Sequence, residues 1–134
     1  MTLTIKGSIP NKKDRLRPRK GGGMYYDKSD RAALDAIVLQ LRAQWKGPPL
    51  ECATVVVKCF RKSARFDPDG QKATILDALK QAGVIHDDNA ARVPDSIVRS
   101  RRALSRAREY TEVQIHAVDS PWPQRKRVSK GEQR

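Results

Sequence analysis

Hydrophobic and polar residues alternate at the start of the chain, and hydrophobic residues then recur at helical spacing. In residues 2–9, Leu3 and Ile5 alternate with polar side chains, which predicts a half-buried strand that ends at Pro10. In residues 29–45, apolar side chains return every three or four positions, which predicts an amphipathic helix. The apolar face of that helix consists of Leu34, Ile37, Val38, Leu41 and Trp45.

A second strand and a second helix are predicted in the middle of the chain. Residues 51–60 form a nearly continuous run rich in β-branched side chains, which is typical of a central strand. Residues 71–82 follow with an apolar face at helical spacing, formed by Ile75, Leu76 and Leu79. Gly83 stands where the carboxyl end of a helix prefers glycine, so the second helix should end there.

Two more strands are predicted in the last third of the chain, at residues 97–100 and 111–118. The segment between them, residues 101–108, fits either a hairpin loop or a helical turn. The order strand, helix, strand, helix, strand, strand predicts an α+β fold with two main helices packed on a mixed sheet of about four strands. Residues 1–118 are long enough to form one domain of this kind.

The charge of the chain is strongly positive and unevenly distributed. Among 134 residues, 28 are Lys or Arg and 15 are Asp or Glu, which gives a net charge of +13. Residues 1–31 and 92–134 each carry +6, whereas residues 32–91 carry only +1. An excess of this size favours a polyanionic partner, and nucleic acid is the leading candidate. The acidic residues in the middle of the chain would repel such a partner, so they need a separate explanation.

Of three basic clusters, two are candidate contacts for DNA phosphates, and the third favours nonspecific attraction to a polyanion. The first lies in a predicted flexible loop at residues 10–28 and contains Lys12, Lys13, Arg15, Arg17, Arg19 and Lys20. The second begins within the third predicted strand and includes Arg99, Arg101 and Arg102, with Arg106 and Arg108 further along. The third lies in residues 119–134, which should be a disordered basic tail.

Several classes of protein can be set aside from the sequence. The longest apolar runs are far shorter than the ~20 residues needed to span a bilayer, so we expect no membrane partner and a cytoplasmic protein. Cys52 and Cys59 would lie on opposite faces of one strand and cannot pair there, so we expect both thiols to be reduced. Two Cys and two His at these positions cannot build a zinc site.

The central carboxylates suggest a metal site. Asp67 and Asp69 alternate in a segment expected to be extended, so both side chains could point to one place just before the second helix. Asp88 would join them if the chain after Gly83 folded back along that helix. Three clustered carboxylates require a cation such as Mg²⁺ or Mn²⁺, which would support phosphodiester hydrolysis. The alternative is that Asp67 only caps the helix and that Asp88 belongs to a solvated turn.

The segment from residue 67 to residue 88 resembles the signature of the RusA family of Holliday-junction resolvases. That family typically has Asp-x-Asp-Asn, a Lys, Asp-Ala-Leu, a Gly and a final Asp-Asp. This chain has the corresponding residues Asp67-Pro68-Asp69-Gly70, Asp77-Ala78-Leu79, Gly83 and Asp87-Asp88. The likeness extends over about residues 3–118 and includes Ile9-Pro10, the cluster Arg15-Leu16-Arg17-Pro18-Arg19 and Tyr25-Tyr26.

The resemblance implies a homodimeric endonuclease, dependent on Mg²⁺ or Mn²⁺, that makes paired nicks in four-way DNA junctions. It assigns Asp67, Asp69 and Asp88 to metal binding and catalysis, in a protein of bacterial, phage or mobile-element origin. The chain departs from the family at Gly70, where the family has Asn, and at Ala73, where it has its catalytic Lys.

Lys72 is assigned the role of offsetting phosphate charge in place of that catalytic Lys. The alternative functions are a catalytically weak or inactive junction-binding or RNA-binding protein of the same fold, and a ribosome-associated structural protein.

Overall fold

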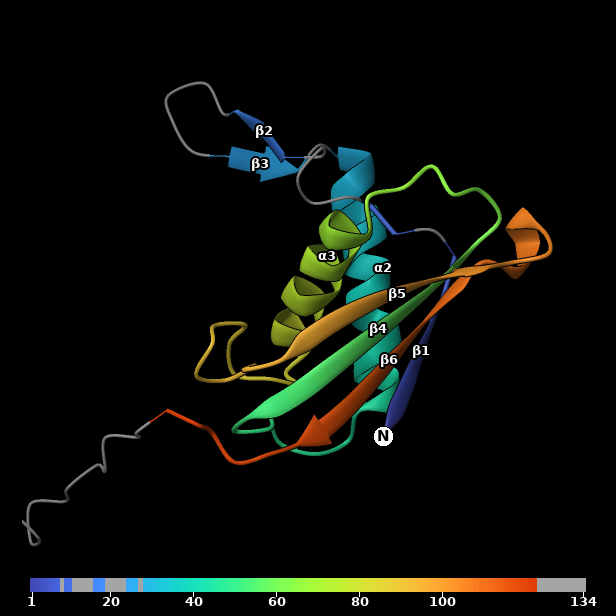
Figure 1. The fold of residues 1–134 in the computed structure, drawn as a ribbon. Helices are drawn as coiled ribbons and strands as arrows, with labels where there is room; N and C mark the ends of the chain where they lie inside the picture. Colours follow the sequence, from blue (N-terminus) through green and yellow to red (C-terminus); the bar gives the residue numbers. More distant parts are fainter. Residues whose placement is uncertain (8, 11–15, 19–23, 27, 123–134) are drawn as a thin grey trace, which may run out of the picture.

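The computed structural model describes residues 1–7, 9–10, 16–18, 24–26 and 28–122. Two helices cover one face of a mixed four-stranded sheet (Figure 1), which confirms the predicted α+β fold. The strand order is β1-β6-β4-β5. The elements are β1 (Thr2–Lys6), α2 (Lys28–Gln44), β4 (Ala53–Arg61), α3 (Pro68–Gln81), β5 (Ser96–Arg102), the 3₁₀ helix η1 (Arg106–Arg108) and β6 (Tyr110–Ala117).

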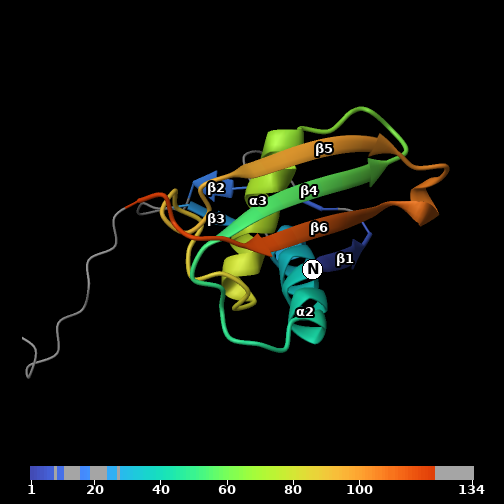
Figure 2. The same ribbon diagram turned by 60° about the horizontal axis from the view of Figure 1, so that its bottom comes forward.

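The order of the strands places the start of α3 beside the ends of two parallel strands. β4 pairs with β5 in parallel and with β6 in antiparallel, and β1 pairs with β6 in antiparallel. Helix α3 is the crossover between β4 and β5, so it runs back across the sheet (Figure 2). In such a unit the crevice at the carboxyl ends of the parallel strands is the common place for a ligand site.

Helix α3 begins three residues earlier than the sequence pattern predicts, because its start is determined by capping. Asp67 is the N-cap, in an extended conformation, and its carboxylate accepts a hydrogen bond from the Asp69 N–H. Pro68 occupies the first helical turn, where a missing N–H costs nothing. The prediction of an extended segment through Asp69 is therefore wrong, since Asp69 lies within the first turn of α3.

The core lies between the sheet and the two helices. Every second residue of β4, from Ala53 to Arg61, is buried against the helices, and the alternate residues are half-buried on the other face. The same core includes Leu34 and Leu41 of α2 and Leu79 of α3. The central position predicted for this strand is confirmed, because β4 lies between β6 and β5.

Two glutamine side chains of α2 cap the free edge of β1. The Thr4 N–H donates to Gln44 Oε1 at 2.8 Å, and the Lys6 N–H donates to Gln40 Oε1 at 2.9 Å. The Gln44 amide in turn donates to Thr4 O at 2.7 Å, and the Gln40 amide donates to Lys6 O at 3.4 Å. These carboxamides take the place of a neighbouring strand, so they protect an edge that could otherwise pair with another chain.

We expect replacement of both Gln40 and Gln44 by Leu to destabilise β1. Loss of these four exposed hydrogen bonds should lower the free energy of unfolding by about 2–4 kcal/mol, since each contributes roughly 0.5–1 kcal/mol net. Hydrogen exchange at the Thr4 and Lys6 amides should become faster. Urea unfolding and amide exchange would measure both effects. The control is Arg31→Leu on the exposed part of α2, and an equal loss in that variant would contradict the edge-capping role.

Cys52 and Cys59 are both buried and form no disulfide in the structure, and their reduced state stays a prediction. Burial raises the pKa of Cys59 above its ordinary value of 9.0, and the nearby charge of Arg61 opposes this shift. The folded protein therefore holds the thiol proton more tightly than the unfolded chain does. This contribution to stability is complete below about pH 9 and is lost as the pH rises through the pKa of the folded state.

Urea unfolding between pH 8 and pH 10.5 should show this loss in the natural protein. A Cys59→Ala variant lacks the titrating thiol, so its stability should fall less over the same range. Identical pH profiles for the two proteins would contradict the assignment to Cys59.

Three segments outside the main helices and strands had their own predictions: residues 10–28, residues 101–108 and the end of the chain. The prediction of a loop without regular structure at residues 10–28 is wrong for part of this segment, because β2 (Leu16–Pro18) and β3 (Met24–Tyr26) form a two-stranded antiparallel sheet there. Of the two readings of residues 101–108, the helical turn is observed as η1, after a β5 that continues to Arg102. Residues 123–134 of the predicted tail lie outside the described residues. No helix in the described part of the chain could cross a membrane.

Candidate functional site

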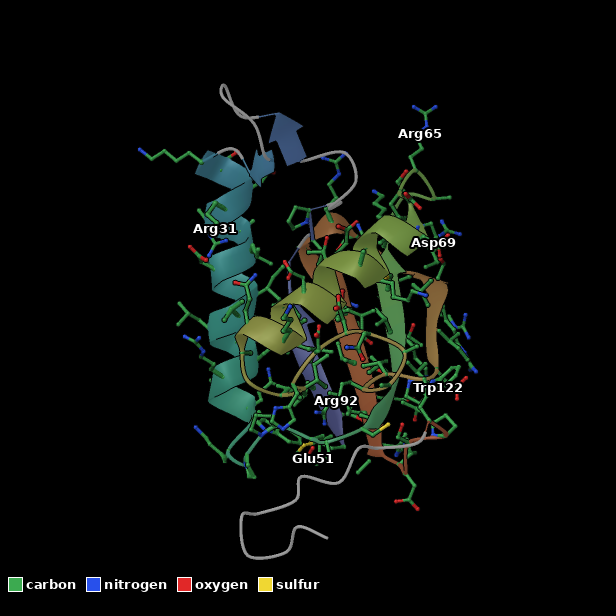
Figure 3. All side chains as sticks on the ribbon, turned by 90° about the vertical axis from the view of Figure 1, so that its left-hand side faces the viewer. Arg31, Glu51, Arg65, Asp69, Arg92 and Trp122 are labelled. Carbon is green, nitrogen blue, oxygen red and sulfur yellow. The ribbon has the colours of Figure 1, made fainter. Side chains whose placement is uncertain are left out.

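Two of the three predicted metal ligands lie at the start of α3. Asp69 is exposed in the first turn, and Asp67 is half-buried at the cap position. The Asp69 N–H lies 3.2 Å from Asp67 Oδ1. Figure 3 places Asp69 at the same end of the molecule as Arg65, next to the end of β5. The two interpretations of this segment, a helix cap and a pair of metal ligands, are thus compatible. The cap uses the carboxylate of Asp67, and the carboxylate of Asp69 stays exposed.

The third predicted ligand, Asp88, does not join this pair within one chain. Helix α3 has 14 residues and is therefore about 21 Å long, and Asp88 follows its far end. The loop containing Asp88 is fixed there, since Ala53 N–H donates to Arg92 O at 2.9 Å at the start of β4. In the described part of the chain, no three His, Cys, Asp or Glu side chains could hold one metal ion together. The expected fold-back of Asp88 along α3 is not found.

The acidic residues around Asp88 are held by their own loop. The Asp88 N–H donates to Asp87 Oδ1 at 2.8 Å, and this bond is the main cause of the lowered pKa of Asp87. Asp87 also lies 3.4 Å from Lys80 Nζ in the last turn of α3. At the same end of the molecule, Arg92 Nη1 lies 2.7 Å from Glu51 Oε2 (Figure 3). These contacts connect the loop that contains Asp88 to the end of α3 and to the segment just before β4.

Lys72 does not point to the carboxylate pair. Its side chain is half-buried in α3, and its Nζ lies 3.5 Å from Ser96 O at the start of β5. β5 is the free edge of the sheet, opposite β1. The ammonium group thus interacts with a main-chain carbonyl on the edge strand. The position of Lys72 in this structure suits a contact between α3 and β5.

A group of exposed basic side chains surrounds the carboxyl ends of β4 and β5. We call it the basic rim; it consists of Lys62, Arg65, Arg101, Arg102 and Arg106. Among the described residues, none of these five forms an ion pair with a carboxylate. The rim therefore presents several uncompensated charges to solvent, which favours a polyanionic ligand.

Arg101, Arg102 and Arg106 of the rim were predicted from the sequence to contact DNA, whereas Lys62 and Arg65 were not. The available signal was the Arg-Lys-Ser-Ala-Arg run at residues 61–65, which only Phe66 separates from Asp67.

A pocket connects the basic rim with the start of α3. It has a volume of about 520 Å³, and its wall includes Lys62, Ser63, Pro68, Arg101 and Arg102. Pro68 stands between Asp67 and Asp69, so this wall brings the carboxylate segment and the rim to one place. A second pocket, of about 580 Å³, includes Arg65, Gln71, Arg106 and Glu109. Arg61 and Phe66 line both pockets.

The predicted DNA contacts of β5 face different surroundings. Arg101 and Arg102 line the pocket. Arg99 follows Val98, which packs against the core, so Arg99 lies on the uncovered face of the sheet, which Arg101 shares by alternation. On that face the rings of Phe60 and Tyr110 stack with centroids 4.3 Å apart.

The predicted contacts of the first basic cluster cannot be compared with the structure. Lys12, Lys13, Arg15, Arg19 and Lys20 lie outside the described residues, and only the backbone of Arg17 is described, within β2.

The geometry of the site therefore places Asp67 and Asp69 on either side of Pro68, which belongs to the wall of a basic pocket at the carboxyl ends of two parallel strands, with Asp88 at the other end of α3. The chain was also compared with known proteins. No protein-family model matches it, and neither does any curated protein.

Proposed function

We propose that this protein is a structure-specific endodeoxyribonuclease that resolves four-way DNA junctions by paired, metal-dependent hydrolysis of phosphodiesters. The observation that carries the proposal is the proximity of acidic and basic groups at one place. Asp67 and Asp69 flank a residue of the pocket wall that also contains Arg101 and Arg102. Carboxylates that bind a hard cation, next to cations that bind phosphate, are the groups that phosphodiester hydrolysis requires.

The donor set fits Mg²⁺ or Mn²⁺. Mg²⁺ is usually held by one or two carboxylates, with water and substrate phosphate completing its coordination. Asp69 is exposed, and Asp67 uses Oδ1 for the helix cap, so the pair offers oxygen ligands of the correct kind. Such an ion would lower the pKa of a bound water and offset charge on the phosphate. Asp67 and Asp69 would hold the ion, and the basic rim would orient the DNA backbone.

A homodimer would give the paired nicks. A four-way junction has approximate two-fold symmetry, and a two-fold dimer presents two identical sites to it. The distance along α3 between Asp69 and Asp88 adds a structural reason, because one chain does not collect all three carboxylates. A second copy of the chain could bring its own Asp88 to the start of α3, and Asp88 would then act only in the dimer.

One observation favours a second candidate, a junction-binding protein with weak or no cleavage activity. Asp67 is engaged as a helix cap, Lys72 contacts Ser96 O, and Gly70 offers no side chain beside them. In this candidate the basic rim binds the DNA backbone as before. The divalent ion would then have no special role.

An assay with a labelled four-way junction separates the two candidates. The protein is incubated with the junction or with a linear duplex of the same sequence, in Mg²⁺, Mn²⁺, Ca²⁺ or chelator, and the products are resolved on a denaturing gel. The proposal predicts symmetric nicks in the junction alone, only with Mg²⁺ or Mn²⁺. Tight junction binding without nicks in any ion would refute hydrolysis and support the second candidate.

A further inference from the structure

Arg61 carries a buried positive charge whose hydrogen-bond acceptors are all uncharged. The residue is only 5% exposed at the end of β4. Its Nη1 donates to Phe60 O at 3.0 Å and to Tyr110 O at 2.8 Å. Its Nη2 donates to Gln71 Oε1 and to Thr111 Oγ1, both at 2.8 Å. These bonds tie β4 to β6 and α3, but they leave the charge itself without a counterion.

No carboxylate of the described residues forms an ion pair with Arg61, and its Nε is buried without a hydrogen-bond partner there. Among the described residues, the Cys59 thiol and the more weakly acting Glu109 carboxylate influence its charge, and the Glu109 carboxylate accepts the Lys62 N–H at 2.9 Å. Burial lowers the pKa of Arg61, because a buried guanidinium loses its hydration. A buried charge of this kind is stabilised when an anion lies nearby.

The pocket of about 520 Å³ next to Arg61 has the chemistry of an anion site. Its lining residues in the described structure include four basic side chains and no acidic one. Ser63 and Ser100 add hydroxyl donors, while Phe66 and Pro68 add apolar surface. Its volume falls within the roughly 300–1,000 Å³ that is typical of small-molecule sites, so it can hold more than a bare ion.

We propose that this pocket binds a phosphate group in the absence of any metal ion, with Arg101 and Arg102 as direct contacts and Arg61 as the buried charge beneath them. Arginine forms paired hydrogen bonds with tetrahedral oxyanions, and phosphate carries more charge than a carboxylate. The apolar wall at Phe66 and Pro68 suits the sugar or base of a nucleotide. The phosphate group therefore belongs to a nucleotide or to a nucleic-acid strand. This inference holds whether or not the protein cleaves DNA.

Isothermal titration calorimetry in chelator tests the proposal with defined probes. The probes are inorganic phosphate, a deoxynucleoside monophosphate, its nucleoside, and a short single strand with or without a 5′-phosphate. Chloride at equal ionic strength is the reference. The proposal predicts saturable binding of inorganic phosphate and the monophosphate, but not of the nucleoside. If the protein binds the 5′-phosphorylated strand more tightly than the unphosphorylated strand, the phosphate comes from a strand end. Equal affinity for the two strands would identify a backbone phosphate.

Variants separate this site from a general effect of charge. Arg101→Gln and Arg102→Gln should each weaken phosphate binding about tenfold, as expected for a lost charge-assisted hydrogen bond. Arg31→Gln is the matched control, because Arg31 is exposed on α2 and pairs with Asp35 at 3.2 Å. Arg61→Lys keeps the buried charge but loses the guanidinium hydrogen bonds.

A folded Arg61→Lys protein that still binds phosphate would confirm the role of the charge. Its loss of binding with the fold intact, an equal loss in Arg31→Gln, or no saturable phosphate binding would each overturn the proposal.

Discussion

The Asp69→Asn variant is expected to lose metal-dependent junction cleavage and to keep junction binding. Asparagine preserves the shape of the side chain and the backbone N–H that bonds to Asp67, but it removes the charge that holds a cation. The metal contributes several kcal/mol of transition-state stabilisation, so cleavage should fall by about 100-fold or more. Binding should stay equal or improve, because a carboxylate next to the DNA backbone is repulsive. Single-turnover cleavage and fluorescence anisotropy measure the two effects.

The controls for Asp69→Asn use two other aspartates. Asp35→Asn changes a carboxylate on exposed α2 that pairs with Arg31, so cleavage should not change. Asp67→Asn should also reduce cleavage, while its stability should stay near that of the natural protein because Asn is as good an N-cap as Asp. Full cleavage by the Asp69→Asn protein would show that the start of α3 does not hold the catalytic ion.

Replacement of Lys62, Arg101 and Arg102 by Gln should have the second largest effect, on DNA binding. These three exposed cations have no carboxylate partner among the described residues, so their charge is available to phosphates. Loss of three phosphate contacts should reduce the slope of log K against log salt by about 2–3 units. Affinity should fall most at low salt. Anisotropy titrations from low to moderate salt give both quantities.

The matched control removes three cations elsewhere. Lys28 and Arg31 are exposed at the start of α2, and Lys46 is exposed two residues after its end. Their replacement by Gln gives the same net charge as the rim variant. If this control reduces the salt slope as much as the rim variant, DNA binding depends on net charge and the basic rim has no special role.

The two main helices and the four strands of the larger sheet followed from local patterns, whereas β2 and β3 were not predicted. Capping determined where one of the helices starts. The apolar spacing in α2 and the alternation in β1 reflect burial on one face, which a sequence displays directly. The start of α3 was misplaced because hydrophobic periodicity begins after Gln71, whereas the helix begins where Asp67 and Pro68 permit it. The preference of Asp for the N-cap and of Pro for the first helical turn would have predicted the correct start of α3.

The position of Asp88 could not be predicted, because it depends on a long-range arrangement. The loop after Gly83 could return along α3 or continue to the start of β5, and no local pattern decides between these routes. In the structure Gly83 has a positive φ of 77°, which glycine adopts readily, and Leu50 then forms a bridge with Ile85. The chain is thereby directed to the amino end of β4, away from Asp69.

The burial of Arg61 could have been predicted from the alternation of residues along β4, although not from the composition of the chain. Val55, Val57 and Cys59 share its parity along β4, so alternation places Arg61 on the same buried face. A basic residue at a core position is uncommon and needs partners or a function. Its four acceptors come from β4, β6 and α3, and only the fold brings those elements together.

Paramagnetic broadening by Mn²⁺ tests most directly whether the start of α3 is the metal site. Substoichiometric Mn²⁺ is added to ¹⁵N-labelled protein, and the loss of each backbone amide signal is compared with that in Asp69→Asn. The account predicts the strongest broadening at residues 66–70, reversal by chelator and no such broadening in the variant. Broadening centred on residues 86–89, or none at the start of α3, would contradict it.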